Sequence, residues 1–158
     1  MRLLILDLDN TLWSHHDISR TEPPYRRISQ DTIVDSMGET IKLNPCAAQV
    51  LSEAKNKGIL LAVASWNNPE KAEEAIVALG LQGFFEEIVV EPHPYKEKMI
   101  RRILRKVGVK PSEAVFVDDN SEICRRVRGA YPELKVFNLG IDIQSLCELL
   151  HLIKQDDL

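Results

Sequence analysis

The sequence of 158 residues is long enough for one domain, which would bury about two thirds of the surface that its unfolded chain exposes. Its 20 basic and 24 acidic side chains give a formal net charge of −4, which argues against a dedicated nucleic-acid-binding protein. The N-terminal apolar run ends at Asp7, too early for a signal peptide, and no stretch approaches the roughly 18 apolar residues of a membrane span. The three cysteines, Cys46, Cys124 and Cys147, show no metal-ligand spacing, so we expect three reduced thiols in a cytoplasmic protein.

Strand-like and helix-like spacings of the apolar residues alternate along the chain. Apolar runs of strand length occur at 3–8, 59–64, 87–90, 114–117 and 135–139. Helical patterns follow at 45–57, 69–80, 96–107, 122–128 and 142–154. Asn44 and Asn68 are the expected caps of the first two helices, each followed by a proline at the first helical position. This alternation predicts a Rossmann-like α/β fold, a doubly wound parallel sheet with helices on both sides.

Residues 14–43 break this alternation, because they contain no clear helix. The stretch TIVDSMGETIKL, residues 32–43, has the pattern of a small β-hairpin that turns at Ser36–Glu39. His15 and His16 are expected to be ordinary loop residues. A loop of this length is unusual in a compact domain unless it has a function. We therefore expect one domain over residues 1–158, with 14–43 as a hairpin insertion near the active site.

Open parallel sheets bind ligands at the carboxyl ends of their strands, so the residues that follow each strand are candidate site residues. These are Asp7, Asp9 and Thr11 after the first strand, Ser65 and Trp66 after the second, Lys96 after the third, and Asp118 and Asp119 after the fourth. Each of them alone has an ordinary explanation as a cap, a turn residue or a packing residue. Four acids, one hydroxyl and one lysine at the same sheet edge are hard to explain as unrelated caps. We interpret them as one site.

Four clustered carboxylates need a cation, because burial and mutual repulsion disfavour their charged forms. Ligands that offer only oxygen, without paired His or Cys, suit a hard ion, and Mg²⁺ is the expected cofactor. A carboxylate beside Mg²⁺, with a lysine and a serine nearby, suits phosphoryl transfer, because these groups can hold the spread negative charge of a phosphoryl group. One carboxylate can attack phosphorus to form an aspartyl-phosphate, and an acid two residues on can protonate the leaving oxygen.

The set formed by DLDNT, Ser65, Lys96 and VDD resembles the four motifs of the haloacid dehalogenase-like (HAD) phosphohydrolases, in the same order along the chain. The segments DLDNTLW, EPPYRR, IKLNP and VFVDDN resemble more narrowly the magnesium-dependent phosphatase (acid phosphatase) group of that superfamily. Members of this group are described as acting on phosphotyrosine and on sugar phosphates. The resemblance therefore implies a Mg²⁺-dependent phosphomonoesterase that acts on a phosphorylated small molecule or a phosphoprotein side chain.

The resemblance implies that Asp7 is the nucleophile and Asp9 the general acid/base. It also implies that the carboxylate of Asp7 and the main-chain carbonyl of Asp9 bind Mg²⁺. One member of the acidic pair completes the metal ligands, with Asp119 favoured and Asp118 as the alternative.

On the phosphate side, the resemblance implies that Ser65 donates a hydrogen bond to the phosphoryl oxygens, helped by the backbone amide of Trp66. Lys96 would neutralise the nucleophile and the phosphate, and Thr11 would steady the loop. Two positions depart from the family pattern, because Asn10 stands where animal members tend to have Tyr and Trp66 where they tend to have Arg. Both positions lie near the expected mouth of the site, so they put the substrate in question rather than the reaction.

Many relatives in the superfamily carry a cap domain that closes over the substrate. Only 31 positions separate Ser65 from Lys96, and a helix and a strand occupy them. We therefore expect a capless architecture with an open site, which could admit a phosphoprotein side chain or a small sugar phosphate. The aromatic residues Trp13, Tyr25 and Trp66 could stack on a substrate ring or pack in the core.

Two other functions use similar residues. A receiver-type signalling domain also forms an aspartyl-phosphate with Mg²⁺, a hydroxyl and a lysine, but its acidic pair follows the first strand and its phospho-acceptor the third. The segment DLDNTLW also resembles domains that load a phosphoglyceryl unit onto an acyl carrier protein, although those domains are usually parts of longer chains. A receiver-like phospho-switch and phosphoglyceryl transfer therefore stay as alternatives to phosphatase activity.

Overall fold

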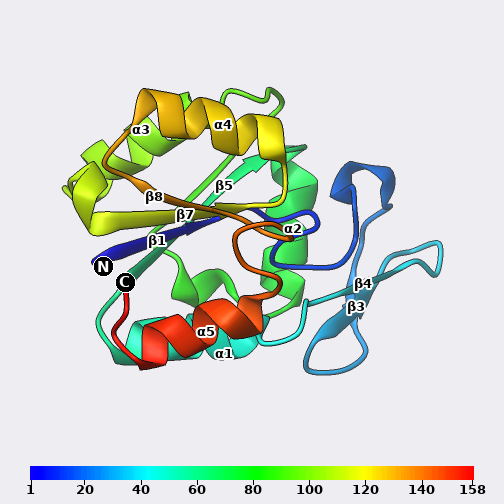
Figure 1. The fold of residues 1–158 in the computed structure, drawn as a ribbon. Coiled ribbons are helices and arrows are strands. Elements are labelled where there is room, and N and C mark those ends of the chain that lie inside the picture. Colours follow the sequence, from blue (N-terminus) through cyan, green and yellow to red (C-terminus); the bar gives the residue numbers. More distant parts are fainter.

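The computed structural model describes residues 1–158 and contains a five-stranded sheet in the order β6-β5-β1-β7-β8 (Figure 1). Its strands are β1 (Leu3–Leu6), β5 (Leu60–Trp66), β6 (Glu87–Glu91), β7 (Ala114–Asp118) and β8 (Lys135–Asn138). Every neighbouring pair runs parallel, which confirms the predicted α/β class. Because β1 lies between β5 and β7, the residues that follow these three strands meet at one sheet edge.

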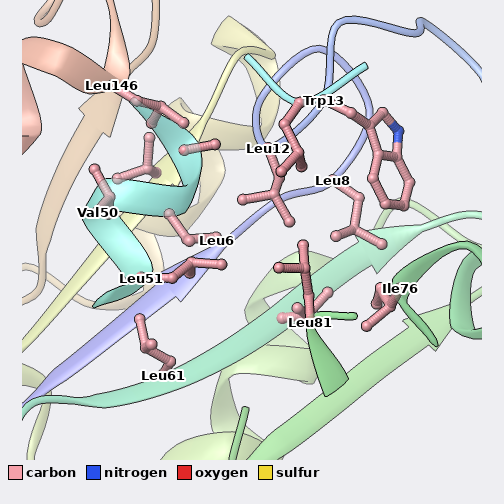
Figure 2. Packing of buried hydrophobic residues seen from close by; sticks show 14 of the residues in the cluster. Leu6, Leu8, Leu12, Trp13, Val50, Leu51, Leu61, Ile76, Leu81 and Leu146 are labelled. Atoms are coloured by element: carbon pink, nitrogen blue, oxygen red, sulfur yellow. The ribbon is translucent and has the colours of Figure 1, made fainter. Parts of the chain in front are cut away.

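Five helices cover the two faces of this sheet: α1 (Ala47–Asn56), α2 (Pro69–Ala78), α3 (Lys96–Val107), α4 (Ser121–Ala130) and α5 (Leu146–Lys154). Helices α1, α2 and α5 pack on one face and α3 and α4 on the other (Figure 1). Leu4 and Leu6 of β1 belong to the first buried cluster, shown in part in Figure 2, whereas Leu3 and Ile5 belong to the second. None of the helices combines the length and the apolar character that crossing a membrane requires.

Residues 14–43 contain a second, antiparallel sheet in the order β2-β3-β4 (Figure 1). Its strands are β2 (Arg26–Arg27), β3 (Thr32–Val34) and β4 (Thr40–Lys42). The predicted hairpin is confirmed as β3 and β4, whereas two exposed arginines gave no signal for β2. The buried carboxylate of Asp35 holds the hairpin turn by accepting hydrogen bonds from three backbone N–H groups at 2.8 to 3.0 Å, those of Glu22, Met37 and Glu39. Three short 3-10 helices complete the fold: η1 (Ile18–Arg20), η2 (Gln82–Phe84) and η3 (Pro111–Glu113).

Two helices begin later than the sequence predicts. The N-cap of α1 is Cys46, in a left-handed conformation with φ 67°, and the expected cap Asn44 instead donates its side-chain amide to the carbonyl of Thr11. Helix α5 begins at Leu146 with Ser145 as its cap, because residues 139–143 form a turn closed by backbone hydrogen bonds. The predicted cap of α2 is confirmed, since the side chain of Asn68 accepts a hydrogen bond from a backbone N–H three residues on.

A disulfide joins Cys46, at the start of α1, to Cys147 in the first turn of α5. The expectation of three reduced thiols is therefore wrong, and only Cys124 is free, in a buried position. The sequence could not indicate this pair, because 101 positions separate the two cysteines and only the packing of α1 against α5 brings them together.

Candidate active site

Lys96 is buried at the first position of α3, among acids that come from two different strands. Its Nζ donates to Oδ1 of Asp7, 2.9 Å away beyond β1, and to Oδ2 of Asp118, 2.6 Å away at the end of β7. Lys96 and Asp118 are each 1% exposed and Asp7 is 6% exposed, so water screens these charges poorly. The structure thus brings together three of the predicted site residues through one ammonium group.

Burial dominates the electrostatics of this cluster. It raises the pKa of Asp7 to about 6, an effect that Lys96 opposes and the neighbouring Asp119 strengthens. Burial, followed by the charge of Asp7, also raises the pKa of Asp118 to about 6. Burial by itself lowers the pKa of Lys96, but the two carboxylates outweigh it and hold that pKa above its usual range. The lysine therefore stays positively charged, whereas the negative charges of the acids around it are only partly neutralised.

Three carboxylates offer oxygen atoms within 4.8 Å of one another, those of Asp7, Asp118 and Asp119. Both oxygens of Asp118 are already engaged, one by the lysine ammonium and the other by the backbone N–H of Asn120 at 2.9 Å. Asp119 is only partly buried, and it accepts one long hydrogen bond, 3.4 Å from Thr11 Oγ1. Three negative charges against one ammonium leave an excess of two, which suits a hard divalent cation with oxygen ligands. Asp119 is the more available metal ligand of the acidic pair.

The turn that follows β1 is tied to its surroundings at Thr11. The hydroxyl of Thr11 lies 3.1 Å from Oδ2 of Asp7, and its carbonyl accepts from the side chain of Asn44 at 2.7 Å. Asn10, which lines the site, has a left-handed φ of 58°, a conformation that asparagine tolerates better than most residues. These contacts give the predicted steadying role of Thr11 a geometric basis.

Ser65 lies near the end of β5, beside the residues that follow β1. The side-chain Oγ is buried and has no hydrogen-bond partner in the protein. Leaving a buried hydroxyl unpaired costs roughly 1–3 kcal/mol, so native proteins seldom keep one without a reason. A hydroxyl held in this way is suited to donate to a ligand oxygen.

The carboxylate of Asp9 lies outside the three-acid cluster and is held by nitrogen donors. Its Oδ1 accepts from Trp13 Nε1 at 2.7 Å and from the backbone N–H of Ile18 at 3.2 Å, and its Oδ2 accepts from Nδ2 of Asn67. Burial raises the pKa of Asp9, and the Trp13 hydrogen bond opposes that rise. The contact of Asn67 with Asp9 could not be predicted, because no local pattern links Asn67 to an acid 58 positions away.

Two adjoining cavities open at this edge of the sheet. The inner cavity, of about 160 Å³, is lined by the acids, Lys96 and their neighbours, and the outer one, of about 710 Å³, by a mixture of acidic, polar and proline residues with Trp66. They share Asp9, His16 and Trp66. Trp66 is 51% exposed, so it stands at the boundary between the two rather than in the core. The place of His16 in the site was missed, because the path of an irregular loop leaves no periodic signal.

The other two aromatic candidates line neither of these cavities. Trp13 is completely buried among apolar residues (Figure 2), and the only hydrogen bond of its side chain is the one to Asp9. Tyr25 lines a separate cavity against α2, with its hydroxyl 2.7 Å from Thr21 Oγ1. Trp66 is therefore the aromatic residue that is placed to contact a substrate.

Known proteins resemble this chain in both sequence and fold. A profile of the acid phosphatase family matches residues 1–138. Human magnesium-dependent phosphatase 1 is 29% identical over 119 residues, which are 75% of this chain and 67% of the relative. A glyceraldehyde 3-phosphate phosphatase of Pyrococcus furiosus is 33% identical over 82 residues, which are 48% of this chain and 33% of that protein.

Among solved structures, the phosphatase-containing N-terminal part of a Bacteroides fragilis protein, in complex with Mg, is 28% identical with a TM-score of 0.68. That match covers 89% of this chain but 36% of the other. A HAD-superfamily hydrolase from Ehrlichia chaffeensis, 17% identical with a TM-score of 0.69, matches 98% of this chain and 96% of its own and supports the fold alone. The chain thus spans only about a third of the Pyrococcus protein and of the Bacteroides N-terminal fragment. Because the family profile matches residues 1–138, the chain belongs to the acid phosphatase family, a group of phosphatases within the HAD hydrolases.

Proposed function

We propose that the chain is a magnesium-dependent phosphomonoesterase that works through an aspartyl-phosphate on Asp7, within one domain over residues 1–158. The observation that carries the proposal is the setting of Asp7. Its carboxylate is buried 2.9 Å from the ammonium of Lys96, beside two further acids, and it lines the small inner cavity. Such a carboxylate is kept out of bulk water and close to a fixed positive charge, as a nucleophile toward a phosphate dianion requires.

The oxygen donors at this edge fit Mg²⁺. The carboxylates of Asp7 and Asp119 would hold the ion, together with the main-chain carbonyl of Asp9 that the family resemblance implies. When bound there, Mg²⁺ supplies positive charge that stabilises the transferring phosphoryl group. Asp118, fixed by Lys96 and by a backbone N–H, holds the lysine in place beside the nucleophile.

In the first half-reaction, Asp7 attacks phosphorus and the bond to the leaving oxygen breaks. Lys96 offsets the negative charge of nucleophile and phosphate, and the unpaired hydroxyl of Ser65 donates to a phosphoryl oxygen. Asp9 gives its proton to the leaving oxygen, so the product departs as a neutral alcohol or phenol.

In the second half-reaction, water hydrolyses the aspartyl-phosphate. Asp9, now a carboxylate, takes a proton from the water that attacks phosphorus. The bond between phosphorus and Asp7 breaks, which releases inorganic phosphate and restores the Asp7 carboxylate. The proton that Asp9 lost in the first step is thereby returned.

The outer cavity supports a small phosphorylated substrate. Its volume of about 710 Å³ falls in the usual range of small-molecule sites. Neither lysine nor arginine lines it, so it favours an uncharged leaving group over one that carries a second phosphate. The name of the Pyrococcus relative also indicates a phosphorylated three-carbon substrate for that protein. A phosphotyrosine-type side chain is the second candidate, because Trp66 at the boundary offers an exposed aromatic face.

Release of phosphate from an aryl phosphate, with and without Mg²⁺, tests the proposal. We expect the parent to need Mg²⁺ and Asp7→Asn to be inactive while keeping the parental fold by circular dichroism. Release without Mg²⁺, or full activity of Asp7→Asn, would contradict the mechanism. A parent that accumulates a long-lived phospho-protein without releasing phosphate would favour the receiver-like switch, and transfer of a glyceryl unit to a carrier protein would favour the other alternative.

A further inference from the structure

Three nitrogen donors from three different segments converge on the side chain of Asp9. Trp13 and the backbone of Ile18 both donate to Oδ1, and Asn67, from the end of β5, donates to Oδ2. Trp13 and Ile18 are completely buried and Asn67 is 8% exposed, so packing holds all three donors in place. The conformation of Asp9 is therefore built into the protein before any substrate binds.

The amide of Asn67 is fixed in one orientation. Its Oδ1 accepts a hydrogen bond from the backbone N–H of Asn68 at 2.6 Å, so its Nδ2 end must face Asp9. Nδ2 has a second, longer contact of 3.3 Å with Oδ1 of Asp17, and the backbone N–H of Asn67 pairs with the carbonyl of Glu91. An amide oxygen turned toward Asp9 would face the carboxylates of Asp9 and Asp17 and would lose these hydrogen bonds.

The two carboxylate oxygens of Asp9 differ in the number of lone pairs that remain free to accept a hydrogen bond or a proton. A carboxylate oxygen has two lone pairs, and the two N–H donors on Oδ1 use both of them. Oδ2 receives a single donor, Asn67, and keeps one lone pair free. Asp9 also lines both cavities, between the acids that surround Asp7 and the outer space. The free position on Oδ2 is therefore the one that can carry the proton for the leaving group.

We propose that Asn67 is a positioning residue for the acid/base step, holding Asp9 so that Oδ2 faces the leaving oxygen of the substrate. The inference rests on the proposed function, because it assigns a role within that reaction. As the P–O bond breaks, the proton on Oδ2 passes to the leaving oxygen, and the N–H of Asn67 stabilises the carboxylate charge that remains. Without that donor, Trp13 and Ile18 still hold Oδ1, but Oδ2 is no longer held toward the leaving oxygen and protonation of the leaving group becomes less efficient.

A series of aryl phosphates with increasingly basic leaving groups distinguishes this role from a general loss of activity caused by a disturbed structure. The series runs from 4-nitrophenyl through phenyl to 4-methoxyphenyl phosphate, and single-turnover release of the phenol reports formation of the aspartyl-phosphate alone. A nitrophenolate leaves readily without a proton, whereas a methoxyphenolate does not. For Asn67→Ala we expect rates within about threefold of the parent with 4-nitrophenyl phosphate, and about tenfold or more below it with 4-methoxyphenyl phosphate.

Two further variants sharpen the test. Asn67→Asp keeps the size of the side chain and its acceptor oxygen but removes the N–H, so we expect it to show the same steep dependence on the leaving group. When Asp9 is already replaced in Asp9→Asn, adding Asn67→Ala should not make the rate depend more steeply on the basicity of the leaving group, because the carboxyl group that Asn67 positions is already absent. Thermal denaturation of each variant establishes that the protein is folded.

The outcomes separate the inference from the function on which it rests. If Asn67→Ala slows all three substrates equally, or if Asn67→Asp keeps the parental dependence, Asn67 does not position Asp9. Additional steepening in the Asp9→Asn background would also overturn the inference. A parent that lacks Mg²⁺-dependent release from every aryl phosphate would overturn the proposed function, and this inference with it.

Discussion

The ammonium of Lys96 lies 2.9 Å from a carboxylate oxygen of Asp7, although 89 positions separate the two residues in the sequence. Methionine fits the space of the lysine stem but lacks the charge, so we expect Lys96→Met to lower turnover of an aryl phosphate by about 10³-fold. Lys98→Met, the same change at an exposed position of the same helix, should keep nearly parental turnover. Steady-state kinetics of the two variants make the comparison, and near-normal rates for Lys96→Met would contradict the assigned role.

We expect the two members of the acidic pair to have different roles, with Asp119 as a metal ligand and Asp118 as a structural residue. At 100 times its dissociation constant, Mg²⁺ should add about 2.7 kcal/mol to the free energy of unfolding of the parent. We expect Asp119→Asn to lose most of this gain and to keep its stability in EDTA, because its side chain has one long hydrogen bond. Asp118→Asn should be less stable even in EDTA, by about 1–3 kcal/mol, since Lys96 loses a charged partner. Thermal denaturation with Mg²⁺ and with EDTA measures both effects, and a full Mg²⁺ response of Asp119→Asn would show that Asp119 is not a ligand.

The hairpin turn should lose stability in acid through Asp35. The N–H of Glu22, followed by those of Glu39 and Met37, holds the pKa of this carboxyl below its usual range. Its contribution to stability is therefore complete above the unfolded pKa of about 3.9 and is lost as the pH falls through the lower folded value. We expect Asp35→Asn to cost about 1–3 kcal/mol at pH 7, and the gap from the parent to narrow below about pH 4.

Urea unfolding of the parent and of Asp35→Asn at pH 7, 4 and 3 would measure this gap. Asp31→Asn is the matched control, because Asp31 is in the same sheet but bonds only to the hydroxyls of Ser29 and Thr32 near the surface. We expect a smaller loss for that variant at pH 7. If the difference in the free energy of unfolding between the parent and Asp35→Asn stays constant with pH, the charge of Asp35 does not contribute to stability.

The disulfide should be a major source of stability. It closes a loop of about 100 residues, for which chain entropy predicts up to about 4.7 kcal/mol, although measured values are typically 2–4. We expect reduction of the parent, and the Cys147→Ser substitution, to lower the denaturation midpoint by similar amounts. Thiol titration in denaturant without reductant should find one free thiol, that of Cys124. Three thiols would show that the bond does not form in the purified protein and would favour the predicted cytoplasmic location, since reducing compartments keep thiols reduced.

The sheet and most of its helices could be predicted because their signals are local. The run from Leu3 to Leu6 is buried on both faces, which produces an unbroken apolar stretch. Asn68 and Pro69 mark the start of α2 within two residues. The place of the site followed from one rule about the ends of parallel strands, and Lys96, Asp7 and Asp118 meet there as expected.

What could not be predicted depends on contacts between distant segments. The sequence places Trp13 four positions after Asp9, but nothing in that spacing says that an indole N–H will face a carboxylate. Asn44 has every mark of a helix cap, yet it bonds to the carbonyl of Thr11, since the turn after β1 lies within its reach. Such competition between a local and a tertiary partner is settled only when the chain is folded.

In the proposed reaction, the inner cavity holds the phosphoryl group and the outer cavity holds the leaving group. The inner cavity is lined largely by residues at strand ends and at the starts of α3 and α4, whereas the outer cavity adds residues of η1 and of the segment between β5 and α2. The two cavities share only Asp9, His16 and Trp66. Ser19, in η1, and Pro92, which follows β6, line the outer cavity alone, so we expect that they can be exchanged while the inner cavity is left intact. A designer who wishes to redirect this phosphatase toward a new alcohol has a small set of positions to vary, and a natural lineage has the same freedom.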